Sequence, residues 1–257
     1  TLEYTPQRKK LHEKIIEKID NKNAYSKDKK PRVIFIGGLT ASGKTQVIAK
    51  LIEHKAGNLP DYQRYKNFVY INSDNFKEML PEYTGANAGL LHEESSDILE
   101  DAITKYTKEN KNIIIDATLK NYTNAKLNMN KFKSLNYKVI LYGTNVKGEN
   151  SILRAANRAV KTNRFVELDY IADSAEKTNK SVLKLRHNAD KYRIFNNDDK
   201  VKSGPKLIES DKSLNQDRIE TSNIVIDNEK QWRELGTDKT DLEGYDDKNY
   251  TEVKKDE

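Results

Sequence analysis

One octapeptide constrains the fold of this 257-residue chain more than any other feature. Residues 38–45 read GLTASGKT and match the phosphate-binding loop pattern G-x-x-x-x-G-K-[ST] at every fixed position. The apolar, β-branched run Val33–Ile36 precedes the loop, and an amphipathic stretch over residues 47–52 follows it. Strand, loop and helix in this order are the context in which the pattern binds phosphate, whereas a chance glycine turn would need neither neighbour.

Each part of the loop has an expected task. Its glycines let the backbone wrap a polyphosphate, so that successive N–H groups and the N-terminus of the next helix face negative charge. The Lys44 ammonium would reach the β- and γ-phosphates, and the Thr45 hydroxyl would bind Mg²⁺. We therefore expect an ATP site built from Gly38, Leu39, Thr40, Ala41, Ser42, Gly43, Lys44 and Thr45.

Short apolar runs alternate with helical patterns along the chain. This alternation is typical of βαβ units, in which helices cover both faces of a parallel sheet. The sequence thus predicts an α/β fold of the P-loop kinase type, with a mostly parallel central sheet, flanking helices and a helical lid segment. The expected strands are Val33–Ile36, Phe68–Ile71, Ile113–Ile115 and Val139–Tyr142, with short additions at Arg193–Phe195, Leu207–Ile208 and Ile224–Ile226.

The chain divides into three parts. Residues 1–30 hold an amphipathic helix over 6–19 and a lysine-rich loop, both expected to dock on the core. Residues 31–235 form the P-loop kinase domain, and residues 236–257 form a polar, acidic tail without periodicity.

Composition narrows the classes of function. The chain has no cysteine, which excludes disulfides, thiolate metal sites and cysteine nucleophiles. No apolar run is long enough to span a bilayer, and we expect a cytoplasmic protein. The net charge of +6 is spread through mixed runs of Lys, Glu and Asp, which disfavours nucleic acid as a partner. His12 and His187 lie among charged residues and are expected at the surface, and Trp232 is expected to pack.

Two carboxylates follow strands at the edge where open α/β sheets bind their ligands. Asp116 ends the run at 113–115, where an acid would hold Mg²⁺ beside Thr45. Asp74 closely follows the run FVYIN and could accept the proton of a substrate hydroxyl as that hydroxyl attacks the γ-phosphate. An aspartate in either place could instead cap the next helix.

A basic helix is expected to begin near Glu149. Arg154 and Arg158 are four residues apart and share a face, and Arg164 follows them. Such a segment is typical of the lid that covers the transferred phosphoryl group in small P-loop kinases. A solvent-exposed basic helix would have the same spacing.

Further motifs follow the phosphate loop in order. They are INSDNF at 71–76, LPEY at 80–83, HEESSDI at 92–98, IIIDAT at 113–118 and a basic R-x-x-x-R…NRF segment at 154–165. Together they resemble the zeta toxin family, the P-loop kinase toxins of bacterial toxin–antitoxin modules, from about Tyr4 to about Asn228.

The resemblance implies a reaction and a substrate side. Zeta toxins transfer the γ-phosphate of ATP to a sugar hydroxyl of UDP-N-acetylglucosamine or a related UDP-amino sugar, which blocks cell-wall synthesis. By resemblance, Asp74 is the general base, and Asp116 and Thr118 form an acidic-x-Thr element beside the substrate. His92 and Glu93 would line the same site.

By the same resemblance, the charge of the transferred phosphoryl group would be neutralised by Lys44, Arg158 and Arg164, with Arg154 as an alternative to Arg158. Asp116 stands where the family's sugar kinases carry the longer Glu, which leaves a nucleotide cofactor or a nucleic-acid end open as acceptor. A nucleotide-gated switch is disfavoured, because the chain has no [NT]-K-x-D guanine-reading motif. A small helical antitoxin that contacts residues 1–30 is the expected protein partner.

Overall fold

The computed structural model describes residues 2–26, 30–52, 61–162, 168–198 and 205–211. Four expectations lie outside the described residues: the strand at 224–226, the packing of Trp232, the position of Arg164 and the tail at 236–257.

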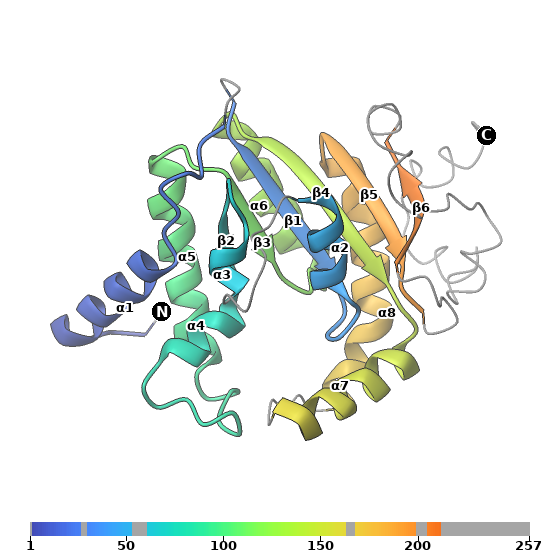
Figure 1. Ribbon diagram of the computed structural model, residues 1–257, viewed down its shortest axis with the longest axis horizontal. Helices are drawn as coiled ribbons and strands as arrows, with labels where there is room; N and C mark the ends of the chain where they lie inside the picture. The colour runs from blue at the N-terminus through green and yellow to red at the C-terminus, as the bar shows by residue number, and fades with distance from the viewer. Residues whose placement is uncertain (1, 27–29, 53–60, 163–167, 199–204, 212–257) are drawn as a thin grey trace.

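A six-stranded sheet forms the centre of the molecule, in the order β2-β3-β1-β4-β5-β6 (Figure 1). The first five strands pair in parallel and β6 pairs antiparallel with β5, which confirms the predicted mostly parallel sheet. The strands are β1 (Arg32–Gly38), β2 (Val69–Ile71), β3 (Ile113–Asp116), β4 (Lys138–Asn145), β5 (Lys191–Asn196) and β6 (Lys206–Ser210).

Helices flank the sheet, and the predicted N-terminal and basic helices are both present. The described helices are α1 (Pro6–Lys18), α2 (Lys44–Leu51), α3 (Asp61–Arg64), α4 (Ser73–Met79), α5 (His92–Lys108), α6 (Tyr122–Ser134), α7 (Gly148–Thr162) and α8 (Leu168–Leu185). None of the described helices is long and apolar enough to cross a membrane.

Strand β1 shows why the central runs are apolar throughout. Val33 and Phe35 belong to the larger apolar cluster, which contains residues of α1, α5, α6 and α8. Ile34 and Ile36 belong to a second cluster, with residues of α2 on the opposite face of the sheet. Because successive strand side chains point to opposite faces, a strand covered on both sides must be apolar at every position.

Helix α1 docks on α5 through its apolar face. Ile15 and Ile16 are buried in the larger cluster, and the Tyr106 hydroxyl on α5 donates to the Ile16 carbonyl. The expectation that His12 lies at the surface is wrong: only 4% of it is exposed, because it faces the Glu94 carboxylate between α1 and α5. His187 is exposed, as predicted.

Asn112, just before β3, connects three segments. Its side-chain oxygen accepts from the Arg32 N–H at 2.9 Å, and its amide donates to the Asn67 carbonyl at 3.2 Å. Its own N–H donates to the Ala24 carbonyl at 2.7 Å. This buried side chain therefore aligns the starts of β1 and β3 with the segment before β2.

The Asn112→Ala variant should lower the free energy of unfolding by roughly 2–4 kcal/mol, since two backbone groups would each lose a partner. Urea denaturation measures this change. Asn130→Ala, at an exposed position of α6, is the matched control and should change stability by less than about 0.5 kcal/mol. Equal stabilities of the two variants would contradict this role of Asn112.

Candidate active site

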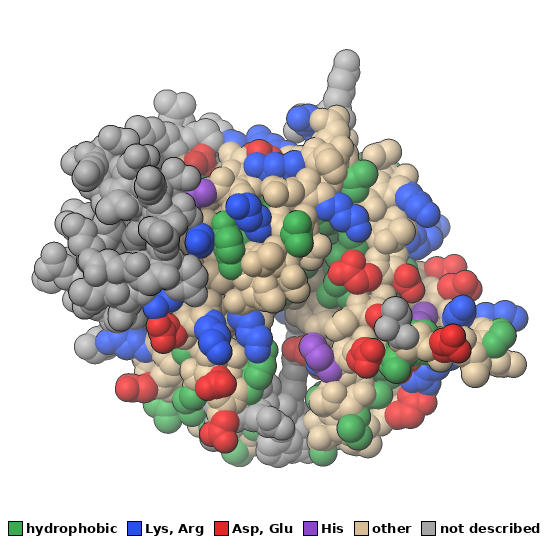
Figure 2. Space-filling view, turned by 180° about the vertical axis from the view of Figure 1, so that it is seen from behind, with side chains coloured by type: hydrophobic (Ala, Val, Ile, Leu, Met, Phe, Trp, Pro, Cys, Tyr) green, Lys and Arg blue, Asp and Glu red, His purple; other side chains and the backbone are tan. Residues whose placement is uncertain are grey.

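The parallel register brings Asp116 and the start of the phosphate loop together at the carboxyl edge of the sheet. Ile36 lies beside Asp116 of β3, and Gly38 lies beside Thr144 of β4. The loop between β1 and α2 leaves this edge between α4 and α7 (Figure 1). Seen from behind, the molecule is hollowed there, with charged side chains of both signs on either side of the hollow (Figure 2).

The phosphate loop needs glycine at two positions. Gly38 has a φ of +146° and Gly43 a φ of +89°, a range that other residues rarely adopt. A Cβ on Gly38 would lie 2.0 Å from the Thr144 hydroxyl oxygen, and a Cβ on Gly43 would lie 1.8 Å from the Asn197 amide nitrogen. Glycine is therefore needed at both positions, because the backbone has a positive φ and because a Cβ would overlap with a neighbouring side chain.

Neighbouring strands and α7 hold the loop in place. The Ser42 hydroxyl lies 2.6 Å from the Thr144 hydroxyl at the end of β4. The Asn197 amide, just after β5, donates to the Ser42 carbonyl at 2.8 Å. Ser151 in α7 donates to the Thr40 carbonyl. The loop is therefore shaped by side chains outside the motif itself.

The start of α2 is suited to bind an anion. Its N-cap is Gly43, so no side chain caps the first turn and competes there with a bound anion. The Lys44 ammonium donates to the carbonyls of Gly38 and Leu39, at 3.1 and 3.0 Å. The same nitrogen lies 3.8 Å from Oδ1 of Asp116, so a cation and a carboxylate meet beside the loop.

Asp116 is held in one orientation by a residue of the neighbouring strand. Only 5% of its side chain is exposed, and the Tyr70 hydroxyl donates to Oδ2 at 2.6 Å. Burial and the charge of Asp116 raise the pKa of Tyr70, so this hydroxyl keeps its proton. Asn121, rather than Asp116, caps α6, which excludes a capping role for this aspartate.

The residues present fit a magnesium ion. Thr45 lies in the first turn of α2, and Asp116 is the last residue of β3. Their hydroxyl and carboxylate oxygens are donors of the kind that Mg²⁺ prefers. In the described part of the chain, no group of three or more His, Cys, Asp or Glu side chains could hold a metal. Such an ion would therefore depend on nucleotide phosphates and water as well.

A second group of residues lies at the starts of α4 and α5. Asp74 occupies the first turn of α4, which Asn72 caps, and 49% of its side chain is exposed. Lys77, only 12% exposed, places its ammonium 3.3 Å from Oδ1 of Asp74. Partial burial and the positive charges of Lys77 and Lys120 lower the pKa of His92, against the opposing effect of Asp74. These side chains thus act on one another.

The remaining predicted residues differ in how they are placed. Thr118 lies at the phosphate loop, where its carbonyl accepts from the Gly38 N–H at 3.3 Å. Arg154 donates from α7 to the Asn197 carbonyl at 2.6 Å, so it is tied to the residue that holds Ser42. Arg158 is half-buried one turn further along α7. Glu93 is exposed in the first turn of α5.

Several contributors to this geometry were not singled out from the sequence, among them Tyr70, Asn72, Thr144 and Asn197. The last three end or follow strands at the carboxyl edge, so the rule that singled out Asp74 and Asp116 also applied to them. Tyr70 could have been noticed as the one hydroxyl-bearing side chain in the apolar run FVYI.

The Tyr70→Phe variant should weaken binding of MgATP by about tenfold, because the Asp116 carboxylate would lose its fixed orientation. Binding of ATP without Mg²⁺ should change by less than about twofold. Isothermal titration of both forms measures the difference. Tyr142→Phe, a buried tyrosine in the same apolar cluster, is the control. Equal losses with and without Mg²⁺ would contradict a role through Asp116.

His92 should titrate below its ordinary pKa of 6.5, because partial burial and two positive neighbours disfavour the imidazolium. Its imidazole would then be mostly neutral at pH 7. NMR titration measures the midpoint, with His92→Gln to assign the signal. Lys77→Met should raise the midpoint, since it removes one positive charge. A His92 midpoint at or above 6.5 would contradict the geometry described above.

Comparisons with known structures agree with the fold. A structure from the PezAT chromosomal toxin–antitoxin system of Streptococcus pneumoniae is 18% identical, with a TM-score of 0.59, over 82% of this chain and 83% of that one. Complexes of AvrRxo1-ORF1 with AvrRxo1-ORF2, one with sulphate ions and one with ATP, have TM-scores of 0.63 and 0.61. Each is 18% identical over 80% of this chain and 68% of that one.

At such identities the likeness shows the fold alone, which agrees with the predicted α/β fold of a mostly parallel sheet flanked by helices. No curated protein matches the chain in sequence. The sequence model of the zeta toxins, in contrast, matches residues 16–203. This match spans well over half of the chain, which therefore belongs to the zeta toxin family.

Proposed function

We propose that the chain transfers the γ-phosphate of ATP to a sugar hydroxyl of UDP-N-acetylglucosamine or a related UDP-amino sugar. One observation carries the proposal: two carboxylates in different surroundings follow neighbouring strands at the same edge of the sheet. Asp116 is buried, locked by Tyr70 and next to Lys44. Asp74 is half-exposed beside Lys77, where a substrate can reach it.

The reaction would follow from these positions. The sugar hydroxyl oxygen attacks the γ-phosphorus in line, the bond between that phosphorus and the ADP oxygen breaks, and Asp74 accepts the hydroxyl proton. The charge on the phosphoryl oxygens would be stabilised by Lys44, by Arg164 and by one arginine of α7, which is either Arg158 or Arg154. A magnesium ion bound by Thr45 and Asp116 would supply further positive charge to the phosphates.

The acceptor would lie against the starts of α4 and α5. A neutral His92 can exchange hydrogen bonds with sugar hydroxyls, and Thr118 and Glu93 would complete the polar lining. The positive charges of Lys77 and Lys120, which act on His92, suit an acceptor that carries phosphate. These features favour a sugar nucleotide over an uncharged sugar.

The shorter Asp116, in place of Glu, keeps a second class of acceptor open: a nucleotide cofactor or a nucleic-acid end. Binding of a nucleic acid should weaken steeply with salt, whereas binding of a sugar nucleotide should respond little. Competition by an oligonucleotide at low salt separates the two.

We further propose that the protein acts as a toxin in the cytoplasm and that a small helical antitoxin occludes its ATP site. Membership of the zeta toxin family supports this proposal, as does the fold shared with a chain from a toxin–antitoxin system. Residues 1–30 are the segment on which we expect the antitoxin to dock, next to the kinase domain at 31–235.

Transfer of labelled γ-phosphate to a panel of UDP-sugars, nucleotide cofactors and oligonucleotides tests the function. Lys44→Ala should abolish transfer. Asp74→Asn should bind ATP normally but lose about 10²- to 10⁴-fold in turnover, because the general base is gone. Asp101→Asn, at an exposed carboxylate in the middle of α5, is the matched control. Full turnover of Asp74→Asn would remove this residue from the mechanism, and transfer only to other acceptors would overturn the substrate.

A further inference from the structure

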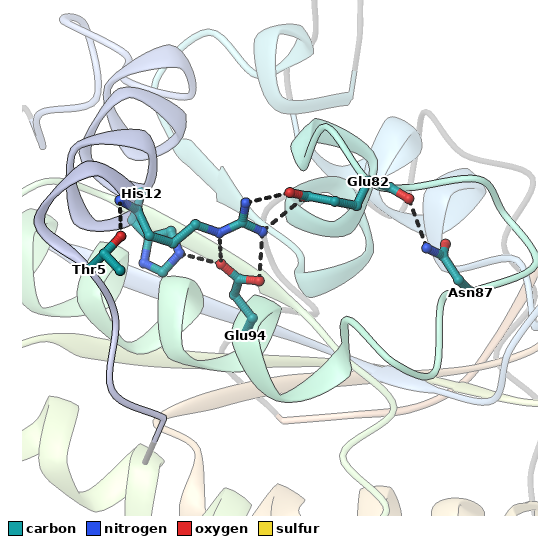
Figure 3. Close-up of polar contacts among 6 residues, drawn as sticks. Thr5, His12, Glu82, Asn87 and Glu94 are labelled. Carbon is teal, nitrogen blue, oxygen red and sulfur yellow. Dashed lines mark hydrogen bonds and ion pairs between the residues drawn. The ribbon is translucent and has the colours of Figure 1, made fainter.

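Helix α1 contacts both ends of the connection between α4 and α5. The Arg8 guanidinium bonds the Glu94 carboxylate through Nε at 2.5 Å and Nη2 at 2.9 Å. It also bonds Glu82 through Nη1 at 2.7 Å and Nη2 at 3.0 Å. In Figure 3, dashed lines join the labelled Glu82 and Glu94 carboxylates to this one guanidinium. A planar guanidinium can hold two carboxylates in this way, whereas an ammonium cannot.

The Glu94 end of this contact is buried. Only 11% of the Glu94 side chain is exposed, and His12 places Nε2 2.6 Å from the same carboxylate. The hydrogen bond with Arg8 is the main reason that the pKa of Glu94 lies below its ordinary value. A charge pair with little exposure is costly to break, because the remaining charge would be left without its partner.

The Glu82 end belongs to a compact turn. The Asn87 amide donates to the Glu82 carbonyl at 2.8 Å (Figure 3). The Thr84 N–H donates to the Asn87 side-chain oxygen at 2.9 Å. The connection between α4 and α5 is therefore shaped by its own hydrogen bonds. Arg8 fixes this shaped turn to α5.

The two carboxylates mark the helices that carry the predicted acceptor residues. Glu82 lies three residues after the end of α4, whose first turn holds Asp74. Glu94 lies in the first turn of α5, directly after His92 and Glu93. One side chain of α1 thus sets the start of α5 relative to the end of α4.

We propose that Arg8 is a positioning residue for the acceptor side of the active site. In the described part of the chain its side-chain hydrogen bonds go to Glu82 and Glu94, and none goes to the phosphate loop. Arg8 therefore acts on the geometry of the acceptor residues and not on ATP. This inference rests on the proposed function, since it assigns Arg8 to one half of that site.

Steady-state kinetics of Arg8→Ala and Arg8→Lys, with ATP and UDP-N-acetylglucosamine as substrates, test the proposal. The KM for the sugar nucleotide should rise by about tenfold or more, while the KM for ATP stays within about twofold. Arg8→Lys should not rescue the loss, because it keeps the charge but not the planar fork. Lys10→Ala, at an exposed position of α1, should match the wild type. A parallel rise in both KM values, or in neither, would overturn the proposal.

Amide hydrogen exchange and the affinity for a fluorescent ATP analogue separate this inference from the substrate assignment. In Arg8→Ala, residues 80–95 should exchange faster, residues 38–52 should keep their protection, and the analogue should bind as to the wild type. These measurements need no acceptor. If the wild type is inactive on UDP-sugars, the proposed substrate is wrong, and the exchange and affinity data still test the role of Arg8. Unchanged exchange at 80–95, or faster exchange throughout, would refute positioning by Arg8.

Discussion

The site depends on β1 lying between β3 and β4. This pairing places Asp116 on one side of the loop that leaves β1 and Thr144 on the other. Both neighbours then restrict the loop: Thr144 contacts Ser42, and Asp116 lies beside Lys44. If β1 were an edge strand, the glycines of the motif would still permit the turn, but no neighbouring strand would restrict the loop on one side.

Burial separates the roles of the two carboxylates. Asp116 has a tyrosine hydroxyl on one oxygen and little access to solvent, which suits a carboxylate held in one place. Asp74 has a lysine on one oxygen and half of its side chain exposed, which suits an acid that must meet a substrate. The same residue type can therefore serve as a fixed charge or as a proton acceptor, according to its surroundings.

The sequence predicted the described strands, the phosphate loop and the edge of the sheet where the candidate site lies, because these follow from local patterns. Apolar runs that alternate with helical patterns indicate a parallel sheet, and ligands bind at the carboxyl edge of such a sheet. Partners set by long-range packing were not predictable in the same way. His12 looks like a surface residue among Lys and Glu, and only the docking of α1 on α5 buries it against Glu94. Likewise, the Tyr70 contact with Asp116 depends on strand register.

The structure of a ternary complex with a non-hydrolysable ATP analogue and UDP-N-acetylglucosamine tests the central claim most directly. The account predicts the analogue's phosphates on residues 38–45, with Lys44 at the γ-phosphate, and the acceptor hydroxyl between that phosphate and Asp74. A sugar nucleotide bound away from the starts of α4 and α5, or a γ-phosphate turned away from Asp74, would contradict it.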